Sequence, residues 1–419
     1  MTDIHRPTSS LGKPLIRRIV EGGSVSVSFQ PICSVRKRQV VGVEALIRGI
    51  DSATGETVPP GVLFGLAEAS GQAQELDRVC RKAVLEAFRG LDAQVPGLLL
   101  FMNFEAAIIE RGAAGSGHLI QMVRELGLDP SSIVIELIAS RAYDMDVLEE
   151  FVERHKSAGF NIALGDMGAG HASLERVALL KPDVLKIDRV VVHEIDQHFH
   201  KQEVLRSVYN LARKTGALVI AEGLETEAEA QMALAIGADL VQGYFLGKPS
   251  APDDLAALEH ARVAVERLCA NYLAVHLEHV RARVDESAER HAIVERAVAE
   301  IAGCAMESID AMLSAIVHRH PGLECVYVID AAGVQVSSTV FDTQIRAPKK
   351  HFIFKPAERG TDHSIKEYFF LLQAGLASYT TDPYISLASG NFCRTISRPY
   401  RGSDGATYIV CLDFAAQAN

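Results

Sequence analysis

Polar side chains that could bind a cation or move a proton recur at the ends of apolar segments in this sequence. Glu44 lies within Val41–Gly49, a run that otherwise consists of Val, Gly, Ala, Leu and Ile up to Arg48. Because burying an ionised Glu is costly unless a cation or hydrogen bonds compensate it, Glu44 should meet a partner inside the fold or mark a ligand site. The alternative is a Glu on the open face of a half-buried strand. Similar residues follow in chain order: Asn103, Glu136, Asp166, Lys186 with Asp188, Glu222 and Gln242.

The segments that carry these residues alternate between strand and helix patterns. Val25–Val35 and Gln39–Arg48 are predicted strands, and the link Arg36-Lys37-Arg38 is so short that they must form an antiparallel hairpin. Later strands are expected at Leu98–Phe104, Ile133–Ile138, Asn161–Gly165, Val184–Ile187, Leu218–Ala221 and Asp239–Gly243. Roughly eight apolar strands with helices between them predict an α/β fold, a closed TIM-like (β/α)8 barrel with an antiparallel first strand. A doubly wound open sheet is the alternative, but no Gly-rich phosphate turn follows a strand.

In such a barrel the strand ends meet at one face, where the chemistry of the fold lies. A ring of carboxylate and amide oxygens with a single Lys suits a hard divalent cation and a phosphate ester, because Mg²⁺ and Mn²⁺ take oxygen ligands. The alternative is a layer of buried polar residues that satisfy one another.

Residues 25–250 resemble the EAL family of cyclic di-GMP phosphodiesterases, with matching motifs in family order and at family spacing. The matching segments are Phe29-Gln30-Pro31-Ile32, Glu44-Ala45-Leu46-Ile47-Arg48, the Asn103 strand, Glu136-Leu137, Lys181–Asp188, Ile220–Glu225, Gln242–Phe245 and Lys248-Pro249. The resemblance implies a barrel with an antiparallel first strand and metal-assisted hydrolysis of cyclic di-GMP to its linear form.

The resemblance also implies a role for each residue around bound Mg²⁺ or Mn²⁺. The implied metal ligands are Glu44, Asn103, Glu136 and Asp166. The implied catalytic residues are Lys186, which would orient the attacking water, and Glu222, which would contribute to a second ion. The implied contacts to cyclic di-GMP are Gln30, Leu46, Arg48, Asp188 and Gln242.

The sequence departs from the family pattern around Asp166. Gly165 stands where the family has the first of two adjacent aspartates, the ligand shared by both ions, and Ala139 stands where a Glu steadies the next loop. That loop, Met167–Leu174, keeps its glycines but lacks the usual Thr and Tyr, and its His171 is not expected to replace a ligand. Because even indirect losses weaken metal sites by ~10–100-fold, we predict a binder of cyclic di-GMP with weak or absent phosphodiesterase activity and a single, weak metal site.

Two alternatives stay open. Glu105, where Ser is usual, or Asp188 could replace the missing carboxylate and give an active phosphodiesterase. The domain could also act as a regulator through protein contacts without binding the nucleotide.

The chain is expected to comprise a barrel domain (1–250), a helical linker (251–320) and a C-terminal domain (321–419). The linker has no proline and only Gly303 between Asp253 and His320, which predicts one long helix or two helices broken near Asp285-Glu286-Ser287. The last part combines predicted strands, at Cys325–Ile329, Val334–Thr339 and three later segments, with one helix at Ile365–Gly375, an α+β layout.

This layout resembles the PAS-like PDC (Cache-type) sensor family, chiefly in Asp382–Ser386 and Arg398–Gly405. The resemblance implies a small-molecule ligand, often a carboxylate or an amino acid in such domains. The candidate pocket residues are Arg359, Tyr368, Tyr384 and Arg394, and for each the alternative is a surface salt bridge or a core aromatic. A homodimer through the linker helix and a protein partner are further expectations.

Charge and hydropathy limit the remaining functions. A net charge of −11 argues against binding to DNA. No apolar run approaches the length of a membrane span and the N-terminus lacks a signal-peptide pattern, so a cytoplasmic location is expected. The seven cysteines are scattered without a C-x-x-C pair, which predicts reduced thiols and no zinc site.

Overall fold

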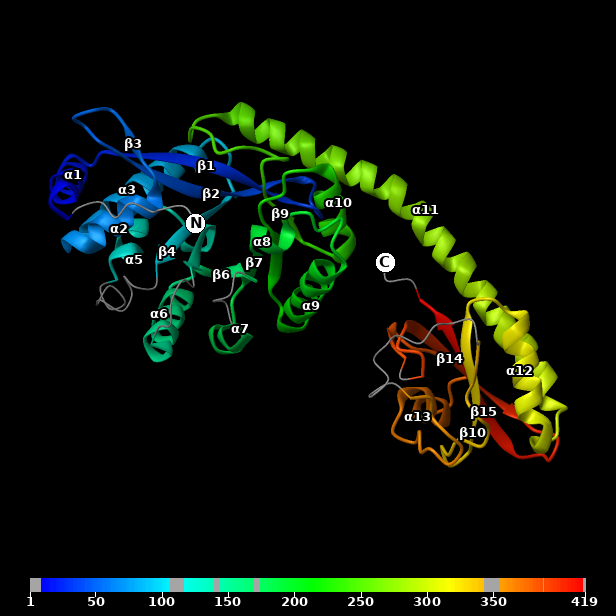
Figure 1. Ribbon diagram of the computed structural model, residues 1–419. Helices are drawn as coiled ribbons and strands as arrows, with labels where there is room; N and C mark the ends of the chain where they lie inside the picture. Colours follow the sequence, from blue (N-terminus) through cyan, green and yellow to red (C-terminus); the bar gives the residue numbers. More distant parts are fainter. Residues whose placement is uncertain are drawn as a thin grey trace. The chain divides into compact units, whose positions relative to one another are not determined.

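The computed structural model describes residues 9–105, 117–138, 144–168, 174–342, 355–386 and 388–416. The chain divides into two compact units, Met1–His276 (unit 1) and Leu277–Asn419 (unit 2) (Figure 1). Ala139, His171 and the rest of the loop 169–173, on which part of the sequence analysis depended, lie outside the described residues.

Unit 1 is a closed barrel. Its strands are β1 (Val25–Ser34), β2 (Gln39–Ile50), β4 (Leu99–Glu105), β5 (Ile133–Ile138), β6 (Asn161–Met167), β7 (Val184–Ile187), β8 (Leu218–Ala221) and β9 (Leu240–Val241), with the short β3 (Thr57–Val58) added to β2. The order β1-β9-β8-β7-β6-β5-β4-β2 closes through the β1–β2 pairing. β1 is antiparallel to both neighbours and the ring is otherwise parallel, which confirms the expected barrel and its antiparallel first strand.

Helices cover the outside of this barrel. They are α1 (Ser9–Gly22), α2 (Pro60–Ser70), α3 (Ala73–Asp92), α5 (His118–Glu125), α6 (Met145–Ser157), α7 (Leu174–Leu180), α8 (Arg189–Val192), α9 (Phe199–Thr215) and α10 (Glu227–Ile236). Their apolar faces pack on outward-facing strand residues such as Leu100, Ile135 and Leu185 in one large core. Because successive strand residues face opposite sides, the alternate residues of the same strands fill the barrel interior.

The lower interior of the barrel is an apolar layer. It is made of Ile32, Phe101, Val134, Ala163, Val184, Ile220 and Leu240. On the parallel strands, the residue two positions after each member of this apolar layer also points into the barrel. It lies one layer nearer the C-terminal face of the barrel. Those residues are Asn103, Glu136, Gly165, Lys186, Glu222 and Gln242. On the antiparallel β1 the equivalent residue precedes Ile32 and is Gln30. The strand period alone therefore stacks a polar layer on an apolar one.

The helix α11 (Leu255–Ala302) begins in unit 1 and ends in unit 2 as 48 continuous residues. Of the two predicted alternatives, one long helix runs through Asp285-Glu286-Ser287 without a break, because this stretch contains no Gly or Pro and its charged side chains are exposed. None of the described helices combines the length and the apolar composition needed to cross a membrane.

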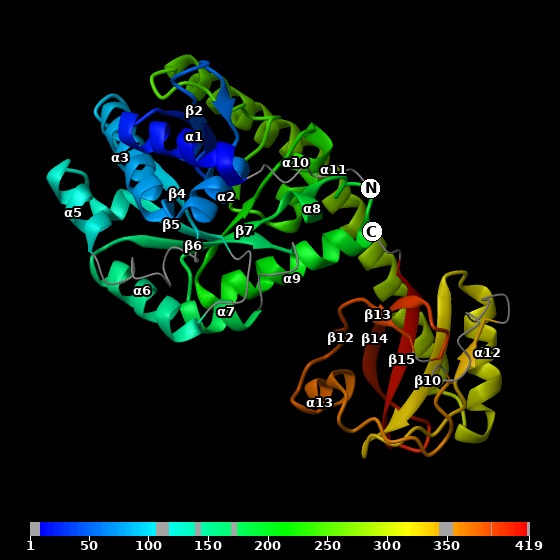
Figure 2. The same ribbon diagram turned by 60° about the vertical axis from the view of Figure 1, so that its left-hand side comes forward.

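Unit 2 is an antiparallel sheet with helices on both faces. Its strands are β10 (Leu323–Asp330), β11 (Val340–Phe341), β12 (Tyr379–Thr380), β13 (Tyr384–Ile385), β14 (Phe392–Arg401) and β15 (Thr407–Ala415). The order is β11-β10-β15-β14-β12, with β13 beside β14. The end of α11 and α12 (Ile309–Arg319) cover one face, and α13 (Glu367–Gln373) covers the other (Figure 2). The strand expected at Val334–Thr339 is wrong: only isolated bridges form there, since Gln335 and Ser337 use their side chains for hydrogen bonds.

Candidate functional site

The polar layer of the barrel converges on one buried ammonium group. Lys186 Nζ lies 2.9 Å from Glu44 Oε2, 2.7 Å from Glu136 Oε2 and 3.3 Å from Glu222 Oε2. The Lys186 side chain is 0% exposed, whereas that of Glu222 is 36% exposed. The layer is therefore closed below by apolar residues and open to solvent beside Glu222 and Asn103.

Amide groups hold the Glu44 carboxylate in place. Asn103 Nδ2 donates to Glu44 Oε1 at 3.0 Å, and Gln242 Nε2 donates to Glu44 Oε2 at 2.8 Å. Gln242 also approaches Gln30 Oε1 at 3.4 Å. Within the described residues, the buried Gln242 Oε1 finds no donor, which leaves one acceptor at this side of the layer.

Three carboxylates share one cation, and their protonation reflects this imbalance. For Glu136, burial raises the pKa to about 8 against the attraction of Lys186, and the charges of Glu44 and Glu222 add to the rise. Burial also raises the pKa of Glu222. Burial acts in the same direction on Glu44, but Lys186 and the hydrogen bonds from Asn103 and Gln242 together lower its pKa. The layer carries more carboxylate than Lys186 neutralises.

Glu136→Gln is expected to stabilise the metal-free protein at alkaline pH. The pKa of Glu136 rises from an ordinary 4.5 to about 8 on folding, so between these values the folded state keeps a proton that the unfolded state has lost. Stability then falls as pH rises through this window. In EDTA, the melting temperature of the variant should fall less than that of the wild type between about pH 5 and about pH 8. Equal slopes for the two proteins would contradict this assignment.

The position of Gly165 lies directly against Glu136. A Cβ built at Gly165 would meet Glu136 Oε1 at 2.8 Å, so this carboxylate fills the space where a side chain would begin. The next residue, Asp166, is half-buried and has a left-handed backbone with φ of 56°. Gly165 has no side chain and therefore supplies no side-chain oxygen at this position.

The remaining predicted ligand contacts lie around this layer. Glu44, Leu46 and Arg48 share one face of β2 by strand alternation, and Arg48 at its end is exposed. Asp188 caps α8, since its Oδ1 accepts a hydrogen bond from the Val190 N–H at 2.6 Å. This hydrogen bond holds the Asp188 side chain at the start of α8. Asp188 would have to give it up to move into the place of the missing carboxylate. Glu105 ends β4, and its side chain lies outside the described part of the structure.

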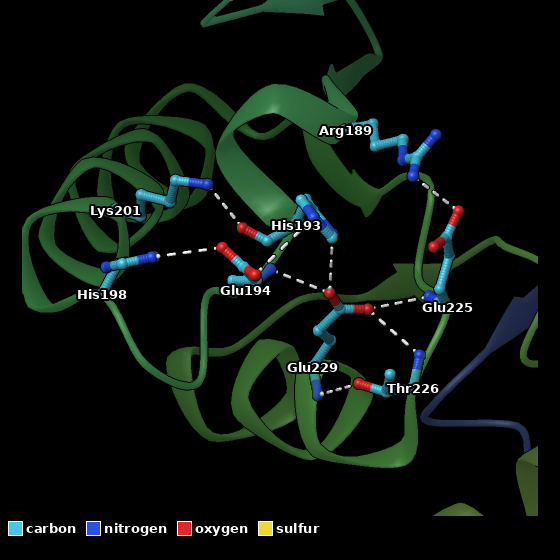
Figure 3. A network of polar contacts seen from close by, with 8 residues as sticks. All are labelled: Arg189, His193, Glu194, His198, Lys201, Glu225, Thr226 and Glu229. Atoms are coloured by element: carbon cyan, nitrogen blue, oxygen red, sulfur yellow. Dashed lines mark hydrogen bonds and ion pairs between the residues drawn. The ribbon is translucent and has the colours of Figure 1, made fainter.

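Glu229, which the sequence analysis did not single out, anchors the loop that follows Glu222. Its Oε2 accepts from the N–H groups of Glu225 and Thr226 at 2.8 and 3.1 Å, and its Oε1 accepts from the Glu194 N–H at 2.8 Å (Figure 3). Arg189 pairs with Glu225 at 2.7 Å across the same loop. The signal in the sequence is the capping-box pattern Thr226-x-x-Glu229.

The donor set of the layer suits a hard divalent cation in chemistry, because it offers carboxylate and amide oxygens with uncompensated negative charge. Within the described residues, however, no three His, Cys, Asp or Glu side chains are gathered into a preformed metal cluster. One oxygen of Glu44 and one of Glu136 accept hydrogen bonds from Lys186 instead.

The predicted pocket residues of unit 2 separate into two groups. Tyr368 and Tyr384 line a cavity on the face of the sheet that carries α13. Arg359 instead pairs with Asp310 at 2.9 Å, and Arg394 lies opposite Phe414 in the β14–β15 ladder. Neither arginine is among the described residues that line the cavity.

Comparison with known proteins identifies the family of unit 1. The sequence profile described as "EAL domain" matches residues 15–249, which include the complete barrel and its polar layer. The chain belongs to the EAL-domain family. The crystal structure of Bacillus subtilis YkuI, a protein with an EAL domain in complex with substrate c-di-GMP and calcium, matches with a TM-score of 0.76 at 24% identity. It covers 96% of this chain and 99% of its own, so the two proteins share their fold over both units.

Two further similar proteins match somewhat more than half of this chain. An uncharacterised protein from Azorhizobium caulinodans is 30% identical over 238 residues, which are 56% of this chain and 32% of that protein. The structure of the MucR phosphodiesterase of Pseudomonas aeruginosa, a c-di-GMP complex, matches 58% of this chain and 99% of its own with a TM-score of 0.53 and 25% identity. The first curated relatives are matched over only about a third of their own length.

Proposed function

We propose that this EAL protein binds cyclic di-GMP at the open end of its barrel and hydrolyses it weakly or not at all. Family membership and the c-di-GMP complex of the MucR relative support the ligand. The observation that supports impaired hydrolysis is Gly165, which supplies no side-chain oxygen. Glu136 Oε1 fills the space where a side chain at this position would begin.

The residues that would hold Mg²⁺ or Mn²⁺ are Glu44, Asn103, Glu136 and Asp166, and Glu222 would contribute to a second ion. When bound, such an ion supplies Lewis acidity and lowers the pKa of a water molecule. Lys186 holds Glu44 and Glu136 in one orientation and compensates part of their charge. We propose a single, weak metal site, because Glu44 and Glu136 each use one carboxylate oxygen to bind Lys186. Gly165 adds no side-chain oxygen.

Arg48→Ala is expected to weaken binding of cyclic di-GMP by about tenfold, because a charge-assisted contact to the dinucleotide is lost from an exposed strand end. Isothermal titration into the full chain with Ca²⁺ measures the change. Arg36→Ala, at the turn end of the same hairpin, is the matched control and should bind like the wild type. Equal affinity in the two variants would remove Arg48 from the site, and no binding by the wild type would overturn the proposed ligand.

An active phosphodiesterase is the second candidate function. It is favoured by the convergence of Glu44, Glu136, Glu222 and Lys186 on one point. Linear product formed by the wild type at a rate comparable to that of a Gly165→Asp variant would select it.

We further propose that unit 2 is a PAS-like sensory domain and that the chain forms a homodimer through α11. Leu273, Leu277 and Val284, spaced by four and seven residues on this helix, are exposed, which is typical of a helix face that pairs with another. Light scattering measures the mass, and a monomer at micromolar concentration would contradict the dimer. A cytoplasmic location stays a prediction.

A further inference from the structure

Unit 2 contains a cavity of about 480 Å³ whose lining includes three tyrosines and a histidine. It lies on the sheet face covered by α13, and the residues that matter for its chemistry are Tyr327, His363, Tyr368, Tyr384 and Asp413. Its size suits a small organic molecule. The nature of the ligand can be argued from the charge at its floor and from the groups in its walls.

The floor of the cavity carries a buried carboxyl group. Asp413 on β15 is 3% exposed and accepts hydrogen bonds from Thr395 Oγ1 at 2.6 Å and from Cys325 Sγ at 3.2 Å. Burial raises the pKa of Asp413 to about 6, which leaves the group mostly ionised at neutral pH. Among the described Lys, Arg and His side chains, none forms an ion pair with it. A buried carboxylate without a cation is costly, and a cationic ligand would compensate it.

The lining of the cavity includes a cluster of aromatic rings in mutual contact. Tyr327 stacks on His363 with ring centroids 5.3 Å apart, and Tyr368 meets Tyr327 edge-on at 6.5 Å. His363 is bound between Tyr368 Oη at 2.7 Å and Gln335 Oε1 at 3.0 Å. Burial lowers the pKa of His363, so its ring is neutral and adds no positive charge. Aromatic faces around a carboxylate are the typical surroundings of an organic ammonium group.

The charged residues among the lining also favour a positively charged ligand. The lining residues include Asp362, Glu367 and Asp382 besides Asp413, against Lys355 and Lys366. Among the described lining residues there is no arginine, the usual partner of a bound carboxylate. Of the two ligand classes that the sequence resemblance implies, carboxylates and amino acids, a simple carboxylate would meet the negative charge of Asp413 at the floor.

We infer that this cavity binds a small organic ammonium ion, with the charged nitrogen against the Asp413 carboxylate and its carbon atoms against Tyr327, Tyr368 and Tyr384. The inference gives the proposed sensory unit a ligand class. Binding to the cavity is measured separately from cyclic di-GMP binding, so the two proposals fail independently.

Three probes of the same length and different charge test the inference on the full chain. Propylammonium, 1-propanol and propionate are each titrated calorimetrically to about 20 mM, because ligands of this size bind weakly. Propylammonium should bind at least about tenfold more tightly than either of the others. Propionate binding as tightly as propylammonium, or no binding by any of the three, would overturn the inference.

Variants test whether propylammonium binds in this cavity. Asp413→Asn should weaken propylammonium binding by about tenfold or more, whereas Glu307→Gln, which removes an exposed carboxylate outside the cavity, should not change it. Tyr368→Leu should weaken it by about fivefold through loss of a ring face, and it serves as the second variant if Asp413→Asn does not fold. Unchanged affinity in a folded Asp413→Asn or Tyr368→Leu protein would place the site elsewhere and contradict the inference.

Discussion

Gly165→Asp is expected to raise the rate of metal-dependent hydrolysis of cyclic di-GMP by about tenfold or more over the wild type. The new carboxylate would add an anionic oxygen beside Glu136 and Asp166, where the protein supplies too few, and losses of supporting groups alone change metal affinity or activity by ~10–100-fold. The backbone at Gly165 is outside the left-handed region, so an Asp can adopt it. The only close contact of its Cβ is the movable end of Glu136 at 2.8 Å.

Chromatography of the linear product, with Mg²⁺ or Mn²⁺ and with EDTA, measures this gain. Gly165→Asn is the matched control, because it has the same shape without the charge and should gain much less. A folded Gly165→Asp protein with the hydrolysis rate of the wild type would show that Gly165 does not limit the reaction.

Lys186→Met is expected to lower the free energy of unfolding by about 3–5 kcal/mol, the usual cost of removing one partner from a buried ion pair. The change leaves Glu44, Glu136 and Glu222 facing one another without a cation. Chemical denaturation at neutral pH in EDTA measures the loss. Lys82→Met is the matched control: Lys82 pairs with Glu86 at 3.9 Å on an exposed helix face, and such pairs contribute roughly 0–1 kcal/mol.

A second substitution tests the cause of that loss. Glu44 is ionised at neutral pH because its pKa is lowered, so adding Glu44→Gln to Lys186→Met removes one of the unpaired charges, and the double variant should recover part of the stability. A loss below about 1 kcal/mol in Lys186→Met, or no recovery in the double variant, would contradict the charge imbalance described for the layer.

The barrel and the position of its site could be predicted from the sequence because both follow from local periodicity. Five of the parallel strands, β4, β5, β7, β8 and β9, lead to a polar residue two positions beyond an apolar interior residue, as Val134 and Glu136 illustrate. Strand alternation then brings these residues together at one face of the barrel, independently of the conformation of the loops. The two interpretations of the ring, as a cation site or as polar residues that satisfy one another, were left open by the sequence, and contacts to Lys186 from three strands could be seen only in the structure.

What the sequence could not decide depended on contacts between distant residues. Arg359 was a candidate pocket residue with a surface salt bridge as the alternative, and the structure has the salt bridge. Its partner Asp310 lies 49 positions away, so the pairing has no sequence signal. The strand expected at Val334–Thr339 alternates correctly, yet Ser337 Oγ binds the Val328 N–H at 2.8 Å and replaces a ladder bond. For the linker, the sequence left open one long helix or two helices broken near Asp285-Glu286-Ser287, and α11 runs through this stretch without a break.

We propose above all that cyclic di-GMP binds to this chain and is hydrolysed weakly or not at all. The most direct measurement is calorimetric titration of cyclic di-GMP into the wild-type protein with Mg²⁺ or Mn²⁺, followed by chromatography of the same samples. The account predicts saturable binding with the cyclic dinucleotide recovered essentially intact. Rapid conversion to the linear product would contradict it, and would mean that a residue other than Gly165 supplies the missing ligand.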